Sequence, residues 1–273
     1  MIYTYLIVSA ALIPILDNFF DILRQPNSWW LVPLLFVSFF VGFVLLQFAV
    51  VMIMVFTTDL QKSPDRGAKF FRTLLKSCLS IIVKTGGVKI NATGTEKLPQ
   101  EGRMLFVCNH QHDFDPAVIL SVFPDSQIAF IGKKEIYTEK PIIARFMHRL
   151  HSLPIDREHD REAAKTIIQA IKQIKEDKVS MAVFPEGYTS KSCELLPLRN
   201  GCFKIATKAN VPIVVCVINN TQSIPSRLFR KKSEVEFRLL DVIYPEQYEG
   251  MNTAQIGDIV YDKMYTALKE IRG

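Results

Sequence analysis

The first part of the chain is mostly apolar. Residues 29–56 contain no charged side chain, and Ser38 and Gln47 are the clearly polar ones. About 20 apolar residues span the hydrocarbon core of a bilayer, so this run is long enough to cross it with some tilt. A shorter apolar run, residues 2–16, precedes it and lacks the basic start of a secretory signal. We therefore predict a membrane anchor over residues 1–61 that contains a membrane-embedded helical hairpin. The first helix of this hairpin crosses the bilayer either fully or only in part.

A positively charged segment follows this anchor. Its basic residues are three, four or eight positions apart, which keeps them on one face of a helix: Lys62, Arg66, Lys69, Arg72, Lys76 and Lys84. The pattern predicts a basic amphipathic connecting helix over residues 62–85 that lies near anionic headgroups. Alternatively, this helix packs on the following domain and exposes a solvated charged face. The positive-inside rule places everything after Phe56 in the cytosol.

Short apolar runs alternate with helical patterns after Gly86 and Gly87. The predicted strands cover residues 88–92, 104–108, 128–131, 179–184, 212–218 and 235–240. The predicted helices cover residues 116–123, 141–150, 161–175, 201–208 and 254–271. This alternation predicts an α/β domain over residues 86–273, with a mostly parallel sheet flanked by helices. Functional sites in such folds gather at the carboxyl ends of the strands.

Composition and charge narrow the expected partners. The net charge of +6 and the pI near 9.0 indicate an anionic partner, either nucleic acid or a lipid surface. No recognised nucleic-acid-binding motif accompanies the charge, and the apolar run already implies a membrane. We therefore expect membrane phospholipids, and no nucleic acid, as partners. The five cysteines include no CxxC pair, which is typical of reduced thiols in a cytosolic domain.

The segment NHQHDFDP, residues 109–116, carries two histidines and two aspartates directly after a predicted strand. Dinuclear metallohydrolase loops with a similar start need an aspartate and a histidine at positions 114 and 115, which here are Phe114 and Asp115; we expect no metal. In the acid/base interpretation, a tight turn brings Asp115 onto one ring nitrogen of His110 and raises the basicity of the other. In the alternative, Asp115 only caps a helix and His110 is only a polar strand end.

Four segments together resemble a known family. NHQHDFD resembles the N-H-x-S-x-x-D block of the glycerolipid acyltransferases, the lysophosphatidic-acid acyltransferase family. SLPIDRE (residues 152–158), FPEGYTS (184–190) and VPIVVCVI (from Val211) resemble its second, third and fourth blocks. The four segments occur in the family's order within residues 86–245, and the apolar N-terminus fits members that carry a two-helix anchor.

The resemblance implies roles for individual residues. His110 is the general base that deprotonates the free hydroxyl of a lysophospholipid, and Asp115 orients it. The hydroxyl then attacks an acyl thioester directly, without an acyl-enzyme. Arg157 holds the acceptor's phosphate, because a guanidinium suits this dianion through two parallel hydrogen bonds. A surface salt bridge to Asp156 or Glu158 is the alternative for Arg157.

The third block implies a further contact with the acceptor. Glu186, on a turn made tight by Pro185 and Gly187, helps to position the acceptor or, alternatively, pairs structurally. The family's threonine and arginine in this block are replaced by Tyr188 and Thr189, which removes a cation near the phosphate. Candidates to supply that cation are Lys191, Arg199 and Lys204. We include Lys204 among the substrate-binding residues because LRNGCFKIA, residues 198–206, resembles the family's basic, glycine-containing helix start.

Two further departures concern histidines. The serine of the first block is His112, and the glycine of the second block is His151.

The sequence predicts a membrane-bound O-acyltransferase that makes phosphatidic acid from lysophosphatidic acid, with acyl-CoA or acyl-ACP as donor and no cofactor. The alternatives are another lysophospholipid or glycerol-3-phosphate as the acceptor, or a catalytically silent protein that binds anionic lipids. The segment SRLFRKKS, residues 226–233, is either a second membrane-contact point or a solvated loop.

Overall fold

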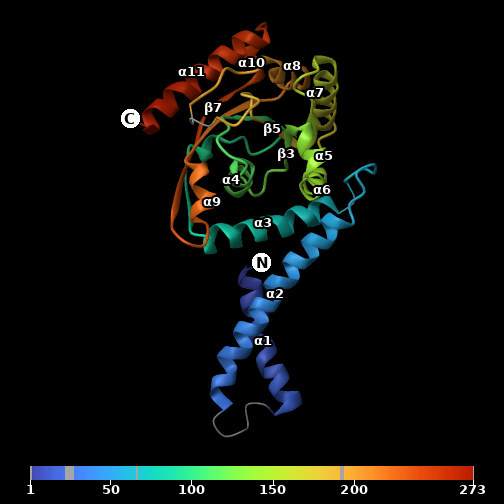
Figure 1. The fold of residues 1–273 in the computed structure, drawn as a ribbon, viewed down its shortest axis with the longest axis vertical. Helices are drawn as coiled ribbons and strands as arrows, with labels where there is room; N and C mark the ends of the chain where they lie inside the picture. Colours follow the sequence, from blue (N-terminus) through green and yellow to red (C-terminus); the bar gives the residue numbers. More distant parts are fainter. Residues whose placement is uncertain (1, 22–27, 66, 191–193, 273) are drawn as a thin grey trace.

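The N-terminal region forms two antiparallel helices that project from the rest of the molecule (Figure 1). The structure is a computed structural model that describes residues 2–21, 28–65, 67–190 and 194–272. Helix α1 covers Ile2–Phe20, a short 3-10 helix η2 covers Ser28–Trp30, and α2 covers Leu31–Phe56. By length and composition, the helix from Ser28 to Phe56 can cross a membrane, whereas the apolar part of α1 is shorter. The predicted helical hairpin is therefore present.

Gln47, a polar residue within the apolar run, joins three helices. The Tyr5 ring of α1 stacks on Phe43 of α2, with centroids 5.8 Å apart, and the Tyr5 hydroxyl donates a hydrogen bond to Gln47. The amide nitrogen of Gln47 donates to the Leu74 carbonyl, 3.1 Å away, in helix α3 (Ala68–Thr85). A buried amide needs such partners, so Gln47 fixes where α3 meets the hairpin.

The connecting helix α3 starts at Ala68, later than predicted. Its basic residues do not share one environment, because some of them contact the following domain. Arg72 donates hydrogen bonds to the carbonyls of Ile128 (2.9 Å) and Leu150 (2.6 Å), and its burial lowers the pKa of the guanidinium to about 10. The prediction that Arg72 faces lipid headgroups is therefore wrong. Lys76 pairs with Asp125 at 2.6 Å, so the alternative, packing on the following domain, holds for this part of the helix. Arg66 lies outside the described residues.

A mixed seven-stranded sheet follows, with strand order β1-β7-β6-β2-β5-β3-β4. Its strands are β1 (Val88–Thr93), β2 (Leu105–Cys108), β3 (Ile128–Lys133), β4 (Leu153–Ile155), β5 (Ser180–Val183), β6 (Ile213–Asn219) and β7 (Ser233–Ile243). Every neighbouring pair is parallel except β6 and β7. The predicted α/β fold with a mostly parallel sheet is confirmed. Strand β4 was not predicted, because it is a three-residue edge strand that contains Pro154.

Helices cover both faces of the sheet. They are α4 (Asp115–Val122), α5 (Lys134–Glu139), α6 (Pro141–Arg149), α7 (Asp160–Lys175), α8 (Lys204–Ala209), α9 (Ile224–Arg227), α10 (Pro245–Tyr248) and α11 (Thr253–Arg272). The short 3-10 helices are η3 (Thr95–Lys97), η4 (Asn200–Phe203) and η5 (Thr221–Ser223). The predicted helices match α4, α6, α7, η4 with α8, and α11. The short helices α5, α9 and α10 were missed because they have too few turns for a visible period.

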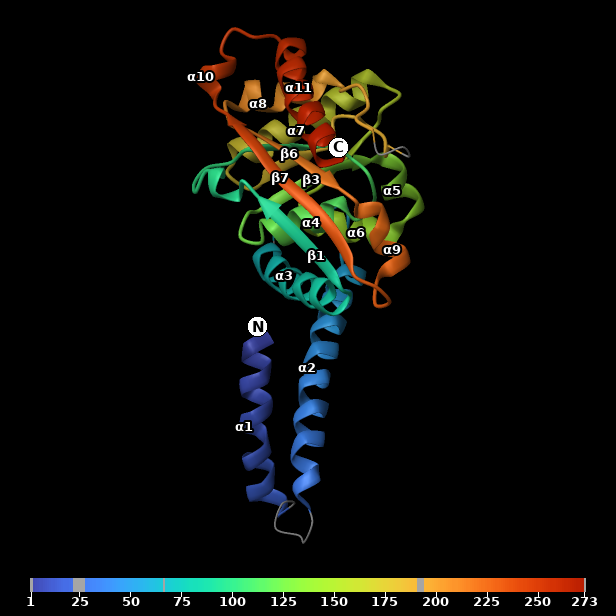
Figure 2. The same ribbon diagram turned by 90° about the vertical axis from the view of Figure 1, so that its left-hand side faces the viewer.

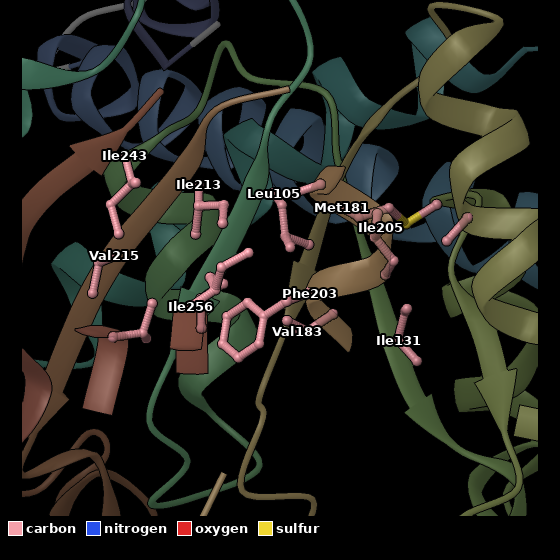
Figure 3. Packing of buried hydrophobic residues seen from close by; sticks show 14 of the residues in the cluster. Leu105, Ile131, Met181, Val183, Phe203, Ile205, Ile213, Val215, Ile243 and Ile256 are labelled. Carbon is pink, nitrogen blue, oxygen red and sulfur yellow. The ribbon is translucent and has the colours of Figure 1, made fainter. Parts of the chain in front are cut away.

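Side chains of the central strands alternate between two apolar cores. Leu105 and Val107 of β2 face α7, α8 and α11, where Phe203 and Ile205 fill the centre of the cluster (Figure 3). Phe106 and Cys108 face the opposite side, which α3, α4 and α9 cover. Burial on both faces explains why the strands are nearly continuous apolar runs. It also leaves the carboxyl ends of β2, β5 and β6 as the places where polar side chains collect.

Candidate active site

His110 and Asp115 face each other across the turn between β2 and α4. The Nδ1 atom of His110 lies 2.8 Å from Oδ2 of Asp115, whose side chain is fully buried. No described residue forms a hydrogen bond with Nε2 of His110, so this nitrogen is available to a substrate. Because a carboxylate accepts from Nδ1–H, the arrangement holds the imidazole with Nε2 as the basic nitrogen. The structure therefore contains the predicted pairing of the two side chains.

Asp115 does not serve as a helix cap. Its Oδ2 accepts hydrogen bonds from the backbone N–H groups of Gln111 (2.7 Å) and His112 (3.0 Å), which precede it in the turn. Its Oδ1 accepts the hydroxyl proton of Thr221, 2.5 Å away. The alternative in which Asp115 only caps α4 is wrong, because α4 has no side-chain cap. These donors, together with Nδ1 of His110, fix the carboxylate in place.

Residues at the end of β6 complete this support. Asn109 exchanges hydrogen bonds with the backbone of Ile218, at 2.9 and 2.8 Å. Gln111 accepts from the backbone N–H of Asn220 at 2.9 Å and donates to Asn219 at 3.2 Å. Sequence reasoning missed Asn109, Gln111 and Thr221. The polar residues that follow β6 could have indicated this support. Strands β6 and β2 are parallel neighbours, so the residues after both strands meet at the same edge of the sheet.

Glu186 braces the backbone of His110. Its carboxylate is buried and accepts the backbone N–H of His110 at 2.6 Å and that of Leu196 at 2.8 Å. Burial raises the pKa of Glu186, and the two N–H donors oppose that rise. The His110 ring also stacks on Phe184, with centroids 4.3 Å apart. Glu186 thus forms structural contacts that hold the turn of His110 against the end of β5.

Two arginines enclose Tyr188. The guanidinium carbon of Arg157 lies 5.6 Å from the centre of the Tyr188 ring, and that of Arg199 lies 5.4 Å from it. Arg199 also donates to the Arg157 carbonyl at 2.9 Å and to the Tyr188 hydroxyl at 3.4 Å. Among the described residues, no carboxylate lies within ion-pair distance of either guanidinium. Burial, and then the charge of Arg199, lowers the pKa of Arg157.

Within the described residues, Arg157 forms neither of the salt bridges considered for it: Glu158 forms no ion pair, and Asp156 is engaged elsewhere. Asp156 pairs with Lys134 at 2.6 Å and with His159 at 3.0 Å. Three cations were considered as substitutes for the arginine missing from the third block. Arg199, one of them, lies beside Arg157. Lys204 is exposed on α8, and within the described part of the chain its side chain forms no hydrogen bond or ion pair. Lys191 lies outside the described residues.

Gly187 allows Arg199 to approach. Its φ is +76°, in the left-handed region, and a Cβ at this position would lie 3.0 Å from Nε of Arg199. Pro185 accepts the backbone N–H of Arg199 at 2.8 Å and precedes this turn. Both residues therefore act on Arg199 through the backbone, and their contact with a substrate stays a prediction.

The additional histidine of the first block contacts Phe114 with its side chain. The His112 ring stacks on Phe114, with centroids 5.5 Å apart, and its Nδ1 accepts the backbone N–H of Phe114. Within the described ranges, no three His, Cys, Asp or Glu side chains are grouped so that they could hold a metal ion.

Comparisons with known proteins identify what the chain is similar to. Residues 89–219 match the family model described as Acyltransferase. A putative 1-acyl-sn-glycerol-3-phosphate acyltransferase of Caenorhabditis elegans is 28% identical over 191 residues, 69% of this chain and 67% of the relative. The 1-acyl-sn-glycerol-3-phosphate acyltransferase of Saccharomyces cerevisiae is 28% identical over 189 residues, 68% of this chain and 61% of the relative. The chain therefore matches about two thirds of these relatives' lengths.

A solved structure shares the fold. The 1-acyl-sn-glycerophosphate acyltransferase of Thermotoga maritima aligns with a TM-score of 0.64 and 20% identity, covering 89% of this chain and 93% of that chain. The chain is thus an acyltransferase. Its residues 89–219 match the Acyltransferase model, and its relatives are 1-acyl-sn-glycerol-3-phosphate acyltransferases, which supports the likeness to the lysophosphatidic-acid acyltransferases predicted from the four sequence blocks.

Proposed function

We propose that the protein transfers an acyl group from an acyl thioester to the free hydroxyl of lysophosphatidic acid, forming phosphatidic acid at a membrane surface. The observation that carries this proposal is the His110–Asp115 pair, with Asp115 fully buried and Nε2 of His110 left available. The names of the relatives supply the acceptor, since they are 1-acyl-sn-glycerol-3-phosphate acyltransferases.

The reaction needs one residue that moves a proton. Nε2 of His110 takes the proton from the acceptor hydroxyl as its oxygen attacks the thioester carbonyl. The carbon–sulfur bond then breaks, and the thiolate leaves with the proton from His110. Such general-base catalysis typically contributes about 10²–10⁴-fold. Asp115 stabilises the imidazolium that forms between the two steps. The thioester supplies the driving force, so the proposal includes no cofactor or metal.

Arg157 and Arg199 bind the acceptor's phosphate in this proposal. Two guanidiniums without a carboxylate partner suit a phosphate dianion, which accepts paired hydrogen bonds from each. Glu186 acts on the acceptor indirectly, because its contacts in the structure are to the backbone of His110 and Leu196. The exposed ring of Tyr188 lies between the two cations and limits the size of the headgroup that reaches them.

Membrane attachment is also part of the proposal. The helix from Ser28 to Phe56 is apolar enough to cross a bilayer, and the basic residues after it favour a cytosolic catalytic domain. A lysolipid acceptor keeps its acyl chain in the bilayer, since exposing each methylene to water costs about 0.8 kcal/mol. An anchored site therefore receives its acceptor without extracting it.

The test is acyl transfer by the purified full-length protein in lipid nanodiscs. Labelled acyl-CoA and acyl-ACP are offered with lysophosphatidic acid, other lysophospholipids and glycerol-3-phosphate. We expect transfer to lysophosphatidic acid, its loss in His110→Ala, and its retention in the matched control His112→Ala. Transfer to a different headgroup would assign another acceptor to the Tyr188 site. No transfer to any acceptor from either donor, with folding verified, would favour the silent lipid-binding alternative.

A further inference from the structure

A basic turn, residues 227–232, connects α9 to β7 and exposes both charged and aromatic side chains. Its cations are Arg227, Arg230, Lys231 and Lys232, and within the described chain none of them forms an ion pair. The nearest carboxylate along the chain, Glu234, pairs with Lys89 at 3.6 Å. The turn is therefore a group of unneutralised positive charges.

The basic turn is held in a fixed shape on the end of α3. Phe229 N–H donates to the Gly86 carbonyl at 3.2 Å, and Ser233 N–H donates to the Gly87 carbonyl at 2.9 Å. Leu228 packs over Gly86 so closely that a Cβ there would lie 2.5 Å from it. Phe229 has a φ of 61°, which bulky residues rarely adopt, and its side chain is 65% exposed. The fold thus presents an aromatic ring to the outside next to the exposed cations of the turn.

The basic turn lies at the end of the catalytic domain that faces the helical hairpin. Figure 1 and Figure 2 both place α9 and the turn after it beside α3, toward α1 and α2. The carboxyl ends of β2, β5 and β6 point to the same end as the start of β7, because β6 and β7 are antiparallel. Thr221, which bonds the catalytic Asp115, lies only a few residues before the turn.

We propose that the basic turn is a second contact with the bilayer in which α2 is anchored, with Phe229 inserted at the interface and its cations on anionic headgroups. The inference rests on the membrane attachment in the proposed function. Aromatic rings favour the headgroup level, and each cation near an anionic surface adds about a fivefold preference for it. With α2 as the first contact, this second contact fixes the tilt of the domain and turns the strand ends that carry His110 toward the lipid.

The test measures the depth of the turn rather than catalysis. In the full-length protein, Trp29→Phe and Trp30→Phe remove both native tryptophans, and Phe229→Trp adds one probe. This protein is placed in nanodiscs of phosphatidylcholine with or without phosphatidylglycerol, with or without bromine on the acyl chains. We expect bromine to quench the fluorescence strongly in discs that contain phosphatidylglycerol.

Charge reversal supplies the matched comparison. Arg230→Glu, Lys231→Glu and Lys232→Glu together should abolish the quenching, because three lost cations weaken the contact by about two orders of magnitude. The control, Lys172→Glu, Lys175→Glu and Lys208→Glu, makes the same change of net charge on exposed positions of α7 and α8, and should leave the quenching unchanged.

Two results would overturn the proposal. Fluorescence that bromine does not affect in any disc would show that the turn stays in water, available to a soluble anionic partner. Quenching that survives charge reversal would show that anionic headgroups are not what the turn recognises. Acyl transfer is measured in the same discs, so quenching without transfer would overturn the proposed function alone, and transfer without quenching would overturn the membrane contact alone.

Discussion

Replacing Asp115 by Asn tests the dyad with the smallest change of shape. The carboxylate accepts from Nδ1 of His110, from two backbone N–H groups and from the Thr221 hydroxyl. An asparagine can place its side-chain oxygen toward the first three donors. Its NH2 group then faces Thr221, whose hydroxyl accepts a hydrogen bond instead of donating one. Orientation of the ring is then retained and the negative charge is lost. The variant isolates the charge that stabilises the imidazolium.

The expected effect is large on the rate and small on substrate binding. General-base catalysis raises the rate about 10²–10⁴-fold. The negative charge of Asp115 supplies much of this enhancement, and the orientation of the His110 ring supplies the rest, so kcat should fall about 10²–10³-fold when the charge alone is lost. The KM values for acceptor and donor should stay within about threefold, because Asp115 is buried behind His110. The assay is steady-state acyl transfer in nanodiscs, with circular dichroism to verify folding.

The control is Asp113→Asn, the same substitution at an exposed position of the same turn. It should leave kcat within about twofold of the wild-type value. A folded Asp115→Asn protein that also transfers at close to the wild-type rate would refute the assignment of His110 and Asp115 as a general-base pair.

Three further predictions follow from contacts in and beside the site. Thr221→Val removes the hydroxyl that donates to Asp115 and should lower kcat about tenfold, whereas Thr221→Ser, which keeps the donor, should restore most of the rate; equal rates for both variants would contradict this. Arg199→Met should raise the acceptor KM about 10–100-fold with kcat nearly unchanged, and Arg199→Lys should recover part of the affinity; an unchanged KM would exclude Arg199 from phosphate binding. Burial lowers the pKa of His151 to about 4, so the unfolded state takes up a proton near pH 6.5 before the folded state does. Stability should therefore fall by about 3 kcal/mol from pH 7 to pH 4, and His151→Asn should remove that part of the loss in urea titrations; an identical pH dependence of the free energy of unfolding in both proteins would contradict it.

Local patterns were enough to predict most of the fold. Each central strand is an apolar run long enough to be buried on both faces, and α7 and α11 have long helical periods, so their positions follow from the sequence. Strand β4 and helices α5, α9 and α10 are too short for any period to show. The direction of β7 was also out of reach, because an apolar strand reads the same whether its neighbour is parallel or antiparallel.

From the residues alone, the candidate site was predictable only where its members are close in sequence, whereas Arg157, Glu186 and Arg199 were named through the family resemblance. His110 and Asp115 share one turn, so their contact follows from the spacing, whereas Arg199 and Thr221 reach the site through the order of β5, β2 and β6. His151 shows how a departure from the family pattern becomes intelligible in the structure. Its φ is 63°, a left-handed conformation in which a glycine is favoured, so the family's glycine at this position is explained by the backbone.

The division of the basic residues after the hairpin has the same origin. Spacing put Arg72 on a shared face with Lys69 and Lys76, but it carries no information about which side of α3 the domain covers. Arg72 instead satisfies two backbone carbonyls, those of Ile128 and Leu150. Lys69 and Lys84 stay exposed on α3, and the fold brings the basic turn, a separate element, next to the end of this helix.

The end of α2 explains how the anchor determines the position of the active site. The last carbonyls of a helix need partners, and here Thr57 and Thr58 donate hydroxyls to Ile53 and Met54. Arg149 of α6 donates to the Met54 carbonyl at 3.2 Å and to the Thr58 hydroxyl at 2.7 Å. A cation at a helix carboxyl end is also favoured by the helix dipole.

The hairpin is therefore joined to the domain by buried and charged contacts rather than by a free linker. His148 contacts the Lys62 carbonyl at 2.9 Å, and His151 lies 3.6 Å from Asp65, so the segment after α2 is held at several points against α6 and the residues that follow it. Because α6 leads through β4 to Arg157, these contacts also determine where Arg157, the proposed phosphate-binding residue, lies relative to the end of α2. Lengthening the Thr57–Pro64 segment should consequently raise the KM for a membrane-embedded acceptor while leaving that for a water-soluble short-chain acceptor unchanged. An equal rise for both acceptors in nanodisc assays would show that the insertion had damaged the domain instead.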